Sequence, residues 1–327
     1  MSASQDVHFQ APTVVNGVQG GLSNAVVNLQ QAKYVHFNRI SFGSNATSMR
    51  ATYLVRMGTN SVGCQFHNCL FAEGNGSGVS ESFMTASSLL YSGGADSLLV
   101  RNCQFSRGTQ GINLVGPAQD NMARGNKVIG CSFMNQNVNS IIVRNQIGAL
   151  IDSNTCNNVY SNSSYAILLQ DCSGATRVTR NTVLVTSGAS CIGATNFFGS
   201  ATGYAIVANN MLISNDDGQS NMLTTPLNII TANYAKIVFN SIKMTAPQRN
   251  GIAAATFGGG VLRNSYFYNN IIGCFDTLNC AFSYIPTDTA VNYSGNNIYY
   301  SLSPVLNKYD GINCYTMNNW WSHLPNR

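Results

Sequence analysis

The stretch SLLVRNCQF, residues 97–105, is the unit that the rest of the chain repeats. Its apolar letters alternate with polar ones on both sides of the pair Arg101 and Asn102. The same phrase stands earlier as GCQFHNCLF (residues 63–71) and later as NKVIGCSF (residues 126–133). Alternation with a period of two is typical of half-buried β-strands. Each copy therefore predicts two short strands joined at a polar bend, with four side chains pointing into a core: Leu98, Val100, Cys103 and Phe105.

A polar bend, marked in most copies by Asn, recurs along the chain at intervals of 24 to 34 residues. A period of this size, built from short β-like runs and small polar turns, indicates a solenoid. Asn suits such bends because it tolerates the left-handed backbone conformation. The anchor positions of the bends are Asn38, Asn68, Asn102, Gly130, Asn154, Asn181, Asn210, Asn240, Asn270 and Asn297.

The composition predicts a folded core and argues against two classes of partner. The chain holds 42 Asn against 29 charged residues, the sum of 17 basic and 12 acidic side chains, and 44% of it is apolar. Apolar content of this size is not typical of disorder. The charge of +5 is spread without a basic run, so nucleic-acid binding is not expected. Membrane insertion is not expected either, since no apolar run reaches roughly 20 residues, and no signal-peptide pattern opens the chain.

Three of the ten cysteines occupy the same position of successive copies, namely Cys69, Cys103 and Cys131. A Phe follows each of them two residues later. Because neighbouring strands lie about 4.8 Å apart, we expect an inward stack of small apolar thiols at this position. A disulfide elsewhere, such as one between Cys274 and Cys280, is left open.

The phrasing I-x-x-N-x-I followed by G-I-x-L, repeated over about residues 25–300, resembles the right-handed parallel β-helix repeats of the pectin-lyase-like superfamily. More narrowly, NAVVNLQQAKYVHFNRISF (residues 24–42) followed by CQFHNCLF (residues 64–71) resembles β-helix modules of large secreted or surface adhesin-like bacterial proteins. The tail from residue 296 to residue 327 is similar to their end segment. The resemblance implies that the chain is a fragment of a longer protein.

The repeats and the resemblance together predict an all-β fold, a single-domain right-handed parallel β-helix solenoid of about ten rungs. We expect an N-terminal cap segment over residues 1–30, whose apolar tail supplies the first strands. The solenoid is expected over residues 31–300. A C-terminal cap segment, cut short by the end of the chain, is expected over residues 301–327.

Enzymes of that superfamily act on polysaccharides in a groove along one parallel sheet, so the resemblance implies where catalytic groups would lie. A lyase needs a Lys or Arg base and a cation that neutralises the uronate carboxylate. Arg144 and Asp171 each lie ten residues before an anchor, Asn154 and Asn181 respectively. This spacing predicts that Arg144 and Asp171 stack on adjacent rungs.

Two further residues flank the same anchors, and one lies on a nearby turn. The candidate catalytic residues are accordingly Lys127, Arg144 and Arg180, and the candidate metal ligands are Asp152 and Asp171. Two Asp and two Arg on neighbouring rungs would suit a calcium ion or a uronate carboxylate. The alternative is an ordinary surface ion pair. No cofactor is required, and Ca²⁺ is the ion that these residues would suit.

Aromatic residues in the middle of the chain indicate a binding module. Tyr160, Tyr165, Phe197 and Tyr204 lie in predicted loops or strand edges. Flat rings exposed along a groove would stack on the faces of sugars. The alternative for Phe197, with Phe198 beside it, is a place in the core inside a loop.

The sequence favours a non-catalytic function, because its charge is low and no acid and base residues converge. We expect an extracellular β-helix module of a bacterial surface or secreted protein, a rigid scaffold or adhesin that binds glycans. By resemblance it would lie outside the cell or at its surface, joined to the rest of a larger surface protein and facing a polysaccharide or a host-cell glycan. The alternative is a polysaccharide lyase or glycoside hydrolase acting on an acidic polysaccharide. Whether the chain is an enzyme is left open, and a lyase is expected if it is one.

Overall fold

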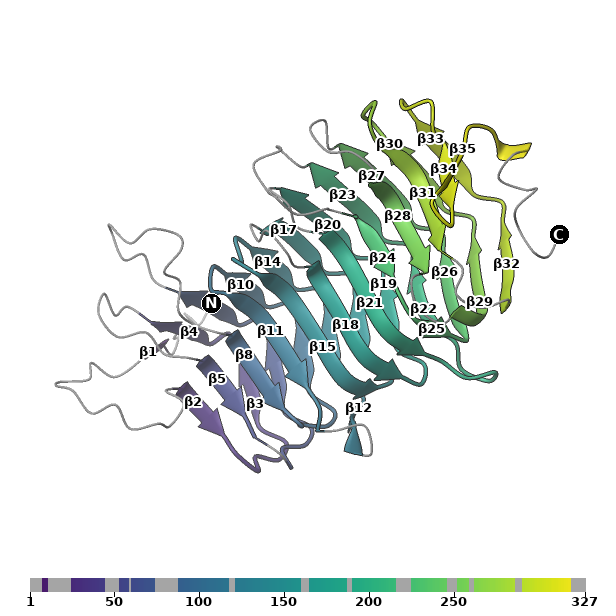
Figure 1. Cartoon of the computed structure of the whole chain (residues 1–327). Coiled ribbons are helices and arrows are strands. Elements are labelled where there is room, and N and C mark those ends of the chain that lie inside the picture. Colours follow the sequence, from purple (N-terminus) through teal and green to yellow (C-terminus); the bar gives the residue numbers. More distant parts are fainter. Residues whose placement is uncertain are drawn as a thin grey trace, which may run out of the picture.

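The computed structural model of the chain consists of short strands that stack from one turn to the next (Figure 1). It describes residues 8–10, 25–44, 53–58, 60–73, 88–117, 121–159, 165–186, 190–215, 225–245, 252–258, 262–285 and 290–318. Every named element in these ranges is a strand, and none of their helical residues forms a helix able to cross a membrane. The prediction of an all-β parallel solenoid is confirmed, and about ten rungs is roughly right. The right-handed sense stays a prediction, in line with the general handedness of parallel crossovers.

Each turn of the solenoid contributes one strand to each of three parallel ladders, here called face 1, face 2 and face 3. Face 1 consists of β2 (Ala25–Leu29), β5 (Tyr53–Met57), β8 (Ser88–Gly93), β11 (Gln110–Val115), β15 (Asn139–Ile147), β18 (Tyr165–Ser173), β21 (Ser190–Phe198), β24 (Leu227–Ile229), β28 (Ala253–Gly258), β31 (Cys280–Ile285) and β34 (Asn307–Tyr309). Figure 1 shows these strands side by side in order of sequence, from purple to yellow.

Face 2 follows face 1 along the chain, and face 3 follows face 2. Face 2 consists of β3 (His36–Asn38), β6 (Gln65–His67), β9 (Leu99–Arg101), β13 (Lys127–Ile129), β16 (Leu150–Asp152), β19 (Arg177–Thr179), β22 (Ala205–Ala208), β26 (Ala235–Val238), β29 (Leu262–Tyr268) and β32 (Ala290–Gly295). Face 3 consists of β1 (His8–Gln10), β4 (Ser41–Ser44), β7 (Leu70–Glu73), β10 (Gln104–Ser106), β14 (Ser132–Met134), β17 (Thr155–Val159), β20 (Thr182–Thr186), β23 (Met211–Asn215), β27 (Ser241–Thr245), β30 (Ile271–Cys274) and β33 (Ile298–Ser301).

A short additional ladder lies at the corner between face 1 and face 2. It begins at β12 (Ala123–Arg124), which pairs with the C-terminal end of β15. The ladder continues through the ends of β18 and β21 to β25 (Ala232–Asn233) and the start of β29. At the same corner of the earlier turns, Lys33, Val62 and Asp96 form single parallel bridges with one another. The corner therefore changes shape at β12.

The ladders extend past both expected boundaries of the solenoid. At the N-terminal end β2 already pairs with β5 in face 1, as expected for an apolar tail that supplies the first strands. At the C-terminal end β34 pairs with β31, and β35 (Ile312–Cys314) folds back antiparallel on β34. Residues 307–314 thus combine a rung of face 1 with an antiparallel hairpin.

The core is built from stacks of identical positions, as the repeated unit predicts. All four predicted inward side chains of residues 97–105 are at most 1% exposed. The ring of Phe105 stacks on Phe71 and Phe133, with ring centroids 4.5 Å and 4.8 Å away. This spacing equals the strand separation of a sheet, so each turn adds one ring to a continuous column.

The cysteines confirm the inward stack and form no disulfide. All ten are buried thiols, Cys274 and Cys280 included. Burial raises the pKa of Cys156 and of Cys172 to about 12. Because the thiolate is the reactive form, these thiols behave as small apolar side chains at neutral pH.

The anchors divide into two kinds. Asn68 and Asn102 do adopt the left-handed conformation at the bend, with φ of 54° and 53°. From Asn154 onward the residue before the anchor makes the bend, as Ser153 and Arg180 do, and the anchor itself points inward. These asparagines form a ladder in which Nδ2 of each of the first five, all buried, donates to Oδ1 of the next at 3.0 Å, and the half-buried sixth accepts the last of these bonds: Asn154, Asn181, Asn210, Asn240, Asn270 and Asn297.

Candidate functional site

Six side chains from consecutive turns gather around the outer surface of face 2 near its C-terminal half. Alternation places them there: in β29, Phe267 is buried at 1% exposure while the tyrosines on either side are half-buried on the outside. We call this cluster the tyrosine patch. Its residues come from the position before β22, from β26 and the positions on either side of it, and from β29. It consists of Tyr204, Tyr234, Lys236, Phe239, Tyr266 and Tyr268.

Register and ring contacts hold the patch together. Lys236 lies opposite Tyr266 in the parallel pairing of β26 with β29. The ring of Tyr204 meets those of Tyr234 and Tyr266 edge to face, with centroids 5.9 Å and 5.7 Å apart. Phe239 and Tyr268 extend the cluster with centroids 6.2 Å apart. Edge-to-face pairs at these distances are favourable contacts of aromatic rings.

A cation lies inside the tyrosine patch. The Nζ atom of Lys236 is 4.3 Å from the centroid of Tyr204 and 5.8 Å from that of Tyr266, within the range of cation–π contacts. A hydrogen bond with Tyr266 raises the pKa of Tyr204, so the phenol stays neutral at physiological pH. The patch therefore offers flat rings, hydroxyl groups and one positive charge.

Two aromatic residues of the patch have an unfavourable backbone conformation. Tyr234 and Phe239 both have left-handed φ values, 50° and 57°. The residues that make the same bend as Phe239 on the adjacent turns are Asn209 and Asn269, which tolerate this conformation. For a bulky residue it is an outlier that costs about 1–2 kcal/mol. Strain of this kind is concentrated at functional sites, and here it accompanies the two aromatic side chains.

Asp152 and Arg180 form an ion pair at the bend between face 2 and face 3. The guanidinium donates from Nε to Oδ1 at 2.9 Å and from Nη2 to Oδ2 at 2.5 Å. Thr179 and Ser153 donate their hydroxyls to the same carboxylate at 2.6 Å and 3.2 Å. Burial alone would raise the pKa of Asp152, but these donors outweigh it and hold the pKa below its usual value. The carboxylate, 4% exposed, is thus fully engaged with protein groups.

Arg144 and Asp171 do not stack on each other, which corrects the expectation. Arg144 lies opposite Gln170 in the pairing of β15 with β18. Asp171 instead makes a left-handed bend, with φ of 52°, and accepts a 2.7 Å hydrogen bond from Nδ2 of Asn196. The reason is one extra residue after β18: three residues separate Ser173 from its next strand, where two separate Ile147 from β16. Counting ten residues back from each anchor therefore pairs Arg144 with Asp171, one position past its true partner Gln170.

The candidate catalytic and metal-binding residues are spread over different parts of the solenoid. Asp152 and Arg180 lie at one end of face 2, whereas Arg144 and Asp171 lie on face 1. Lys127 is exposed in β13, in the outward column at the other end of the face 2 strands. Across the ranges that the structure describes, no group of three or more His, Cys, Asp or Glu side chains is placed to hold a metal ion. The predicted cluster of two Asp and two Arg is not formed.

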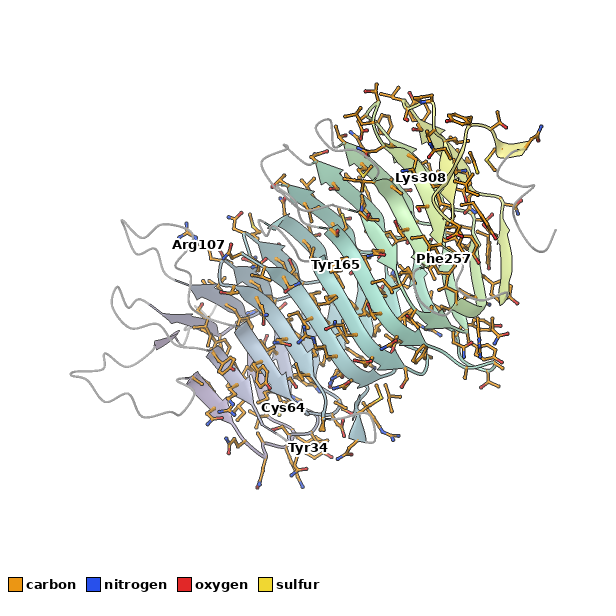
Figure 2. The ribbon with its side chains drawn as sticks, viewed as in Figure 1. Tyr34, Cys64, Arg107, Tyr165, Phe257 and Lys308 are labelled. Atoms are coloured by element: carbon orange, nitrogen blue, oxygen red, sulfur yellow. The ribbon has the colours of Figure 1, made fainter. Side chains whose placement is uncertain are left out.

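The predicted sugar-stacking aromatics have four different outcomes. Tyr204 belongs to the tyrosine patch. Tyr165 lies on face 1 (Figure 2), where its ring packs over Gly193 and its hydroxyl accepts a 2.8 Å hydrogen bond from Asn228. Phe197 is 0% exposed, so its ring is part of the core and the prediction that it contacts sugars is wrong. Tyr160 lies outside the described residues.

Most of the tyrosine patch was not predicted from the sequence, although a signal for it exists. Lys236 and Tyr266 are separated by 30 residues, one full period of the repeat in that region. An aligned pair of outward positions at this spacing lies on adjacent turns. The motif YFY at residues 266–268 reads as one inward ring between two outward ones. Aligning the outward columns, and not only the anchors, would have found the cluster.

These features define the chain as a parallel β-solenoid with an aromatic surface patch. No family model matches it, and no curated protein is significantly similar to it. Among solved structures, a cysteine-to-alanine mutant of DFA-IIIase from Arthrobacter chlorophenolicus A6 in complex with DFA-III aligns at a TM-score of 0.35 and 9% identity, over 86% of this chain and 74% of that chain. DFA-IIIase from the same organism in complex with GF2 aligns at a TM-score of 0.27 and 10% identity, over 83% and 80%. Similarity at this level defines neither a family nor a site.

Proposed function

We propose that the solenoid is a non-catalytic glycan-binding module and that the tyrosine patch is its binding surface. The observation that carries the proposal is the pair of strained aromatic residues, Tyr234 and Phe239. Asn at either position would relieve the backbone strain, so each of these rings is present at a cost in stability. Partly exposed rings on a rigid sheet suit the apolar faces of sugars, and the tyrosine hydroxyls suit the sugar edges.

The charge on face 2 supports an acidic glycan as the ligand. Lys127, Arg177 and Lys236 occupy the same outward column, with Leu150 and Ile206 on the turns between them. The cations therefore recur every second turn, about 9.6 Å apart along the solenoid axis. A linear polysaccharide with one carboxylate in each disaccharide would present anions at a comparable spacing. Such contacts are exposed, so the affinity would fall as salt screens them.

In this proposal the solenoid is a rigid scaffold or adhesin, extracellular or at the surface of a bacterium, within a larger surface protein. A rigid stack of strands holds its rings in fixed positions, which lowers the entropy lost on binding. The partner is a polysaccharide or a host-cell glycan. No cofactor is required for binding of this kind.

Affinity electrophoresis through gels containing alginate, polygalacturonate, hyaluronan or dextran tests the proposal. We expect retardation by at least one acidic polymer. The retardation should be lost in Tyr266→Ala and weakened by Lys236→Gln, whereas Tyr315→Ala, an exposed tyrosine (58%) outside the tyrosine patch, should migrate as the parent chain does. Migration of the parent chain that no polymer alters, or retardation that Tyr266→Ala leaves unchanged, would contradict the proposal.

A second assay separates binding from catalysis. A lyase acting on polygalacturonate with calcium produces unsaturated products that absorb in the ultraviolet. If the chain released such products and Arg180→Ala abolished the turnover, the non-catalytic proposal would fail. We expect no turnover, because the carboxylate of Asp152 and the guanidinium of Arg180 are bound to each other.

A further inference from the structure

A groove lies at the corner between face 1 and face 2 near the N-terminal end of the solenoid. It encloses about 610 Å³, within the range typical of small-molecule sites. Its apolar lining residues are Val62, Pro117, Met122 and Ala123. Its polar lining residues are Gln31, Lys33, Asn60, Asp96 and Asn121.

The groove lies where the single bridges of the corner give way to the corner ladder that begins at β12. Lys33, Val62 and Asp96 form consecutive parallel bridges and make one side of it. Met122 and Ala123, at the start of β12, make the other. The backbone N of Arg124 donates a 2.6 Å hydrogen bond to Oδ1 of Asp96, which fixes this carboxylate in the lining of the groove. The groove therefore results from the change in strand pairing at this corner.

Two amide side chains project from adjacent turns of the groove. Gln31 and Asn60 precede the bridged residues Lys33 and Val62 by two positions and have left-handed φ values of 55° and 66°. Gly94 holds the same position on the third turn, with φ of 88°, and has no side chain to fill the space. An amide offers both donors and an acceptor, so this pair suits hydroxyl groups that also do both.

One positive and one negative group stand at the two ends of the bridged column. Lys33 and Asp96 are two turns apart, about 9.6 Å. Among the described residues, neither Lys33 nor Asp96 has an ion-pair partner, so both charges are available to a ligand. The hydrogen bond from Arg124 uses Oδ1 of Asp96 and leaves Oδ2 as an acceptor. The two charges cancel, which favours a neutral ligand rich in hydroxyl groups.

An exposed aromatic residue stands next in the chain to Lys33, which lines the groove. Tyr34 directly follows Lys33, is 72% exposed and has a left-handed φ of 55°. Its ring lies against Gly63 of the next turn, where an added Cβ would come within 2.6 Å of the Tyr34 Cδ1 atom. The ring thus contacts the backbone of the next turn near one edge, while most of the side chain is exposed. Figure 2 shows Tyr34 at the N-terminal end, on the edge where Figure 1 places β12.

We propose that this groove binds a short neutral saccharide of about two or three units. The exposed Tyr34 ring would stack on one sugar, and the amides of Gln31 and Asn60 would bond to hydroxyl groups. Lys33 and Asp96 would bond to hydroxyl groups at the two ends. An aromatic residue with a left-handed backbone, as in the tyrosine patch, thus recurs next to a groove whose two charges cancel.

The groove is independent of the tyrosine patch. Tyr34 and Tyr234 each stand two residues before a paired position of face 2, His36 and Lys236. Seven strand-to-strand steps separate those positions, about 34 Å at the spacing of parallel strands. Substitutions at one site should therefore not change binding at the other.

Isothermal titration of the whole chain with cellotriose, laminaritriose, maltotriose and trigalacturonic acid tests this inference. We expect at least one neutral trisaccharide to bind. Its affinity should fall at least about tenfold in Tyr34→Asn, which removes the ring but keeps the bend, and in Asp96→Asn, which removes the acceptor charge. Tyr204→Ala and Tyr315→Ala should bind as the parent chain does.

Three results would overturn the inference. The first is no binding of any neutral trisaccharide, and the second is a parent-like affinity in both Tyr34→Asn and Asp96→Asn. The third is binding lost in Tyr204→Ala alone, which would place the trisaccharide on the tyrosine patch. Thermal unfolding of each variant shows whether it is folded. Asn60→Gly removes the amide but keeps a residue that tolerates the left-handed backbone at this position. This variant should be folded and should bind the trisaccharide more weakly than the parent chain does.

Discussion

The backbone N of Cys131 donates a 2.9 Å hydrogen bond to Oδ1 of Asn154, its counterpart on the next turn. This bond joins the two stacks that run inside the solenoid. On the N-terminal side the position is held by cysteine, whose thiol reaches a backbone carbonyl, as Cys103 does to Phe66 at 3.4 Å. On the C-terminal side asparagine makes the corresponding bond, as Asn154 does to Val128 at 3.0 Å. One structural role is thus filled by two residue types.

The asparagine ladder should dominate the stability of the C-terminal half. Asn240 accepts from the N and Nδ2 atoms of Asn210 and donates to Val207 and Asn270, all while 1% exposed. Asn240→Ala leaves several buried groups unpaired, so we expect the free energy of unfolding to fall by about 2–5 kcal/mol. Denaturant unfolding measures it. Asn209→Gly, which keeps the left-handed bend beside the ladder residue Asn210, is the control, and an equal loss there would argue against the ladder.

The buried thiols should be unreactive in the native state. Burial holds the pKa of Cys156 and Cys172 at about 12, whereas an unfolded cysteine titrates near 8.5. The native state therefore keeps these protons where the unfolded state loses them, so stability falls as pH rises from about 8.5 toward 12. At pH 8 we expect these two thiols to react with a disulfide reagent only after denaturation. Rapid labelling of either in the folded protein would contradict this burial.

The ion pair between Asp152 and Arg180 should make stability sensitive to acid. The pKa of Asp152 lies below its unfolded value of about 3.9, so the native state binds fewer protons there than the unfolded state. Its contribution is complete above about pH 5 and disappears as pH falls through the native pKa. Asp152→Asn should lower the melting temperature at pH 6, and the difference from the parent chain should shrink at pH 3. A difference that stays constant with pH would show that the charge does not matter.

Relieving the strain at Phe239 should separate stability from binding. Phe239→Asn places at this bend the residue type that Asn209 and Asn269 supply on the adjacent turns, so we expect a gain of about 1 kcal/mol in the free energy of unfolding. The same change removes an exposed ring and should weaken retention by an acidic polymer. Tyr234→Asn should behave alike. A loss of stability with unchanged retention would mean that the ring serves packing alone.

The solenoid itself could be predicted because its signal is local. Within residues 97–105, inward and outward positions alternate over a few letters, and the burial of Leu98, Val100, Cys103 and Phe105 follows from that alternation. The role of each anchor does not follow from the sequence, because Asn serves both as a bend residue, at Asn102, and as a buried ladder residue, at Asn154. One letter cannot distinguish these roles.

The candidate site was harder to predict because it depends on register over many turns. A single additional residue after β18 moved Arg144 away from Asp171 and opposite Gln170. Phe197 and Tyr204 look alike as aromatic letters in a Gly- and Ser-rich region, yet one is 0% exposed and the other lies on the surface. The contact of Lys236 with Tyr204 joins residues 32 positions apart. Such contacts follow only from a correct count of every turn.

Oxidative footprinting with and without glycan tests the central claim most directly, because it reports where a bound polymer covers the surface. The protein is exposed to hydroxyl radicals alone and with the acidic polymer that retards it best, and oxidation of each aromatic residue is read by mass spectrometry. We predict that oxidation of Phe239, 53% exposed, and of Tyr266 falls on binding, while Tyr315 at the C-terminal end is oxidised equally in both samples. Unchanged oxidation of Phe239 and Tyr266 under conditions of saturating polymer would contradict the assignment of the tyrosine patch as the glycan-binding surface.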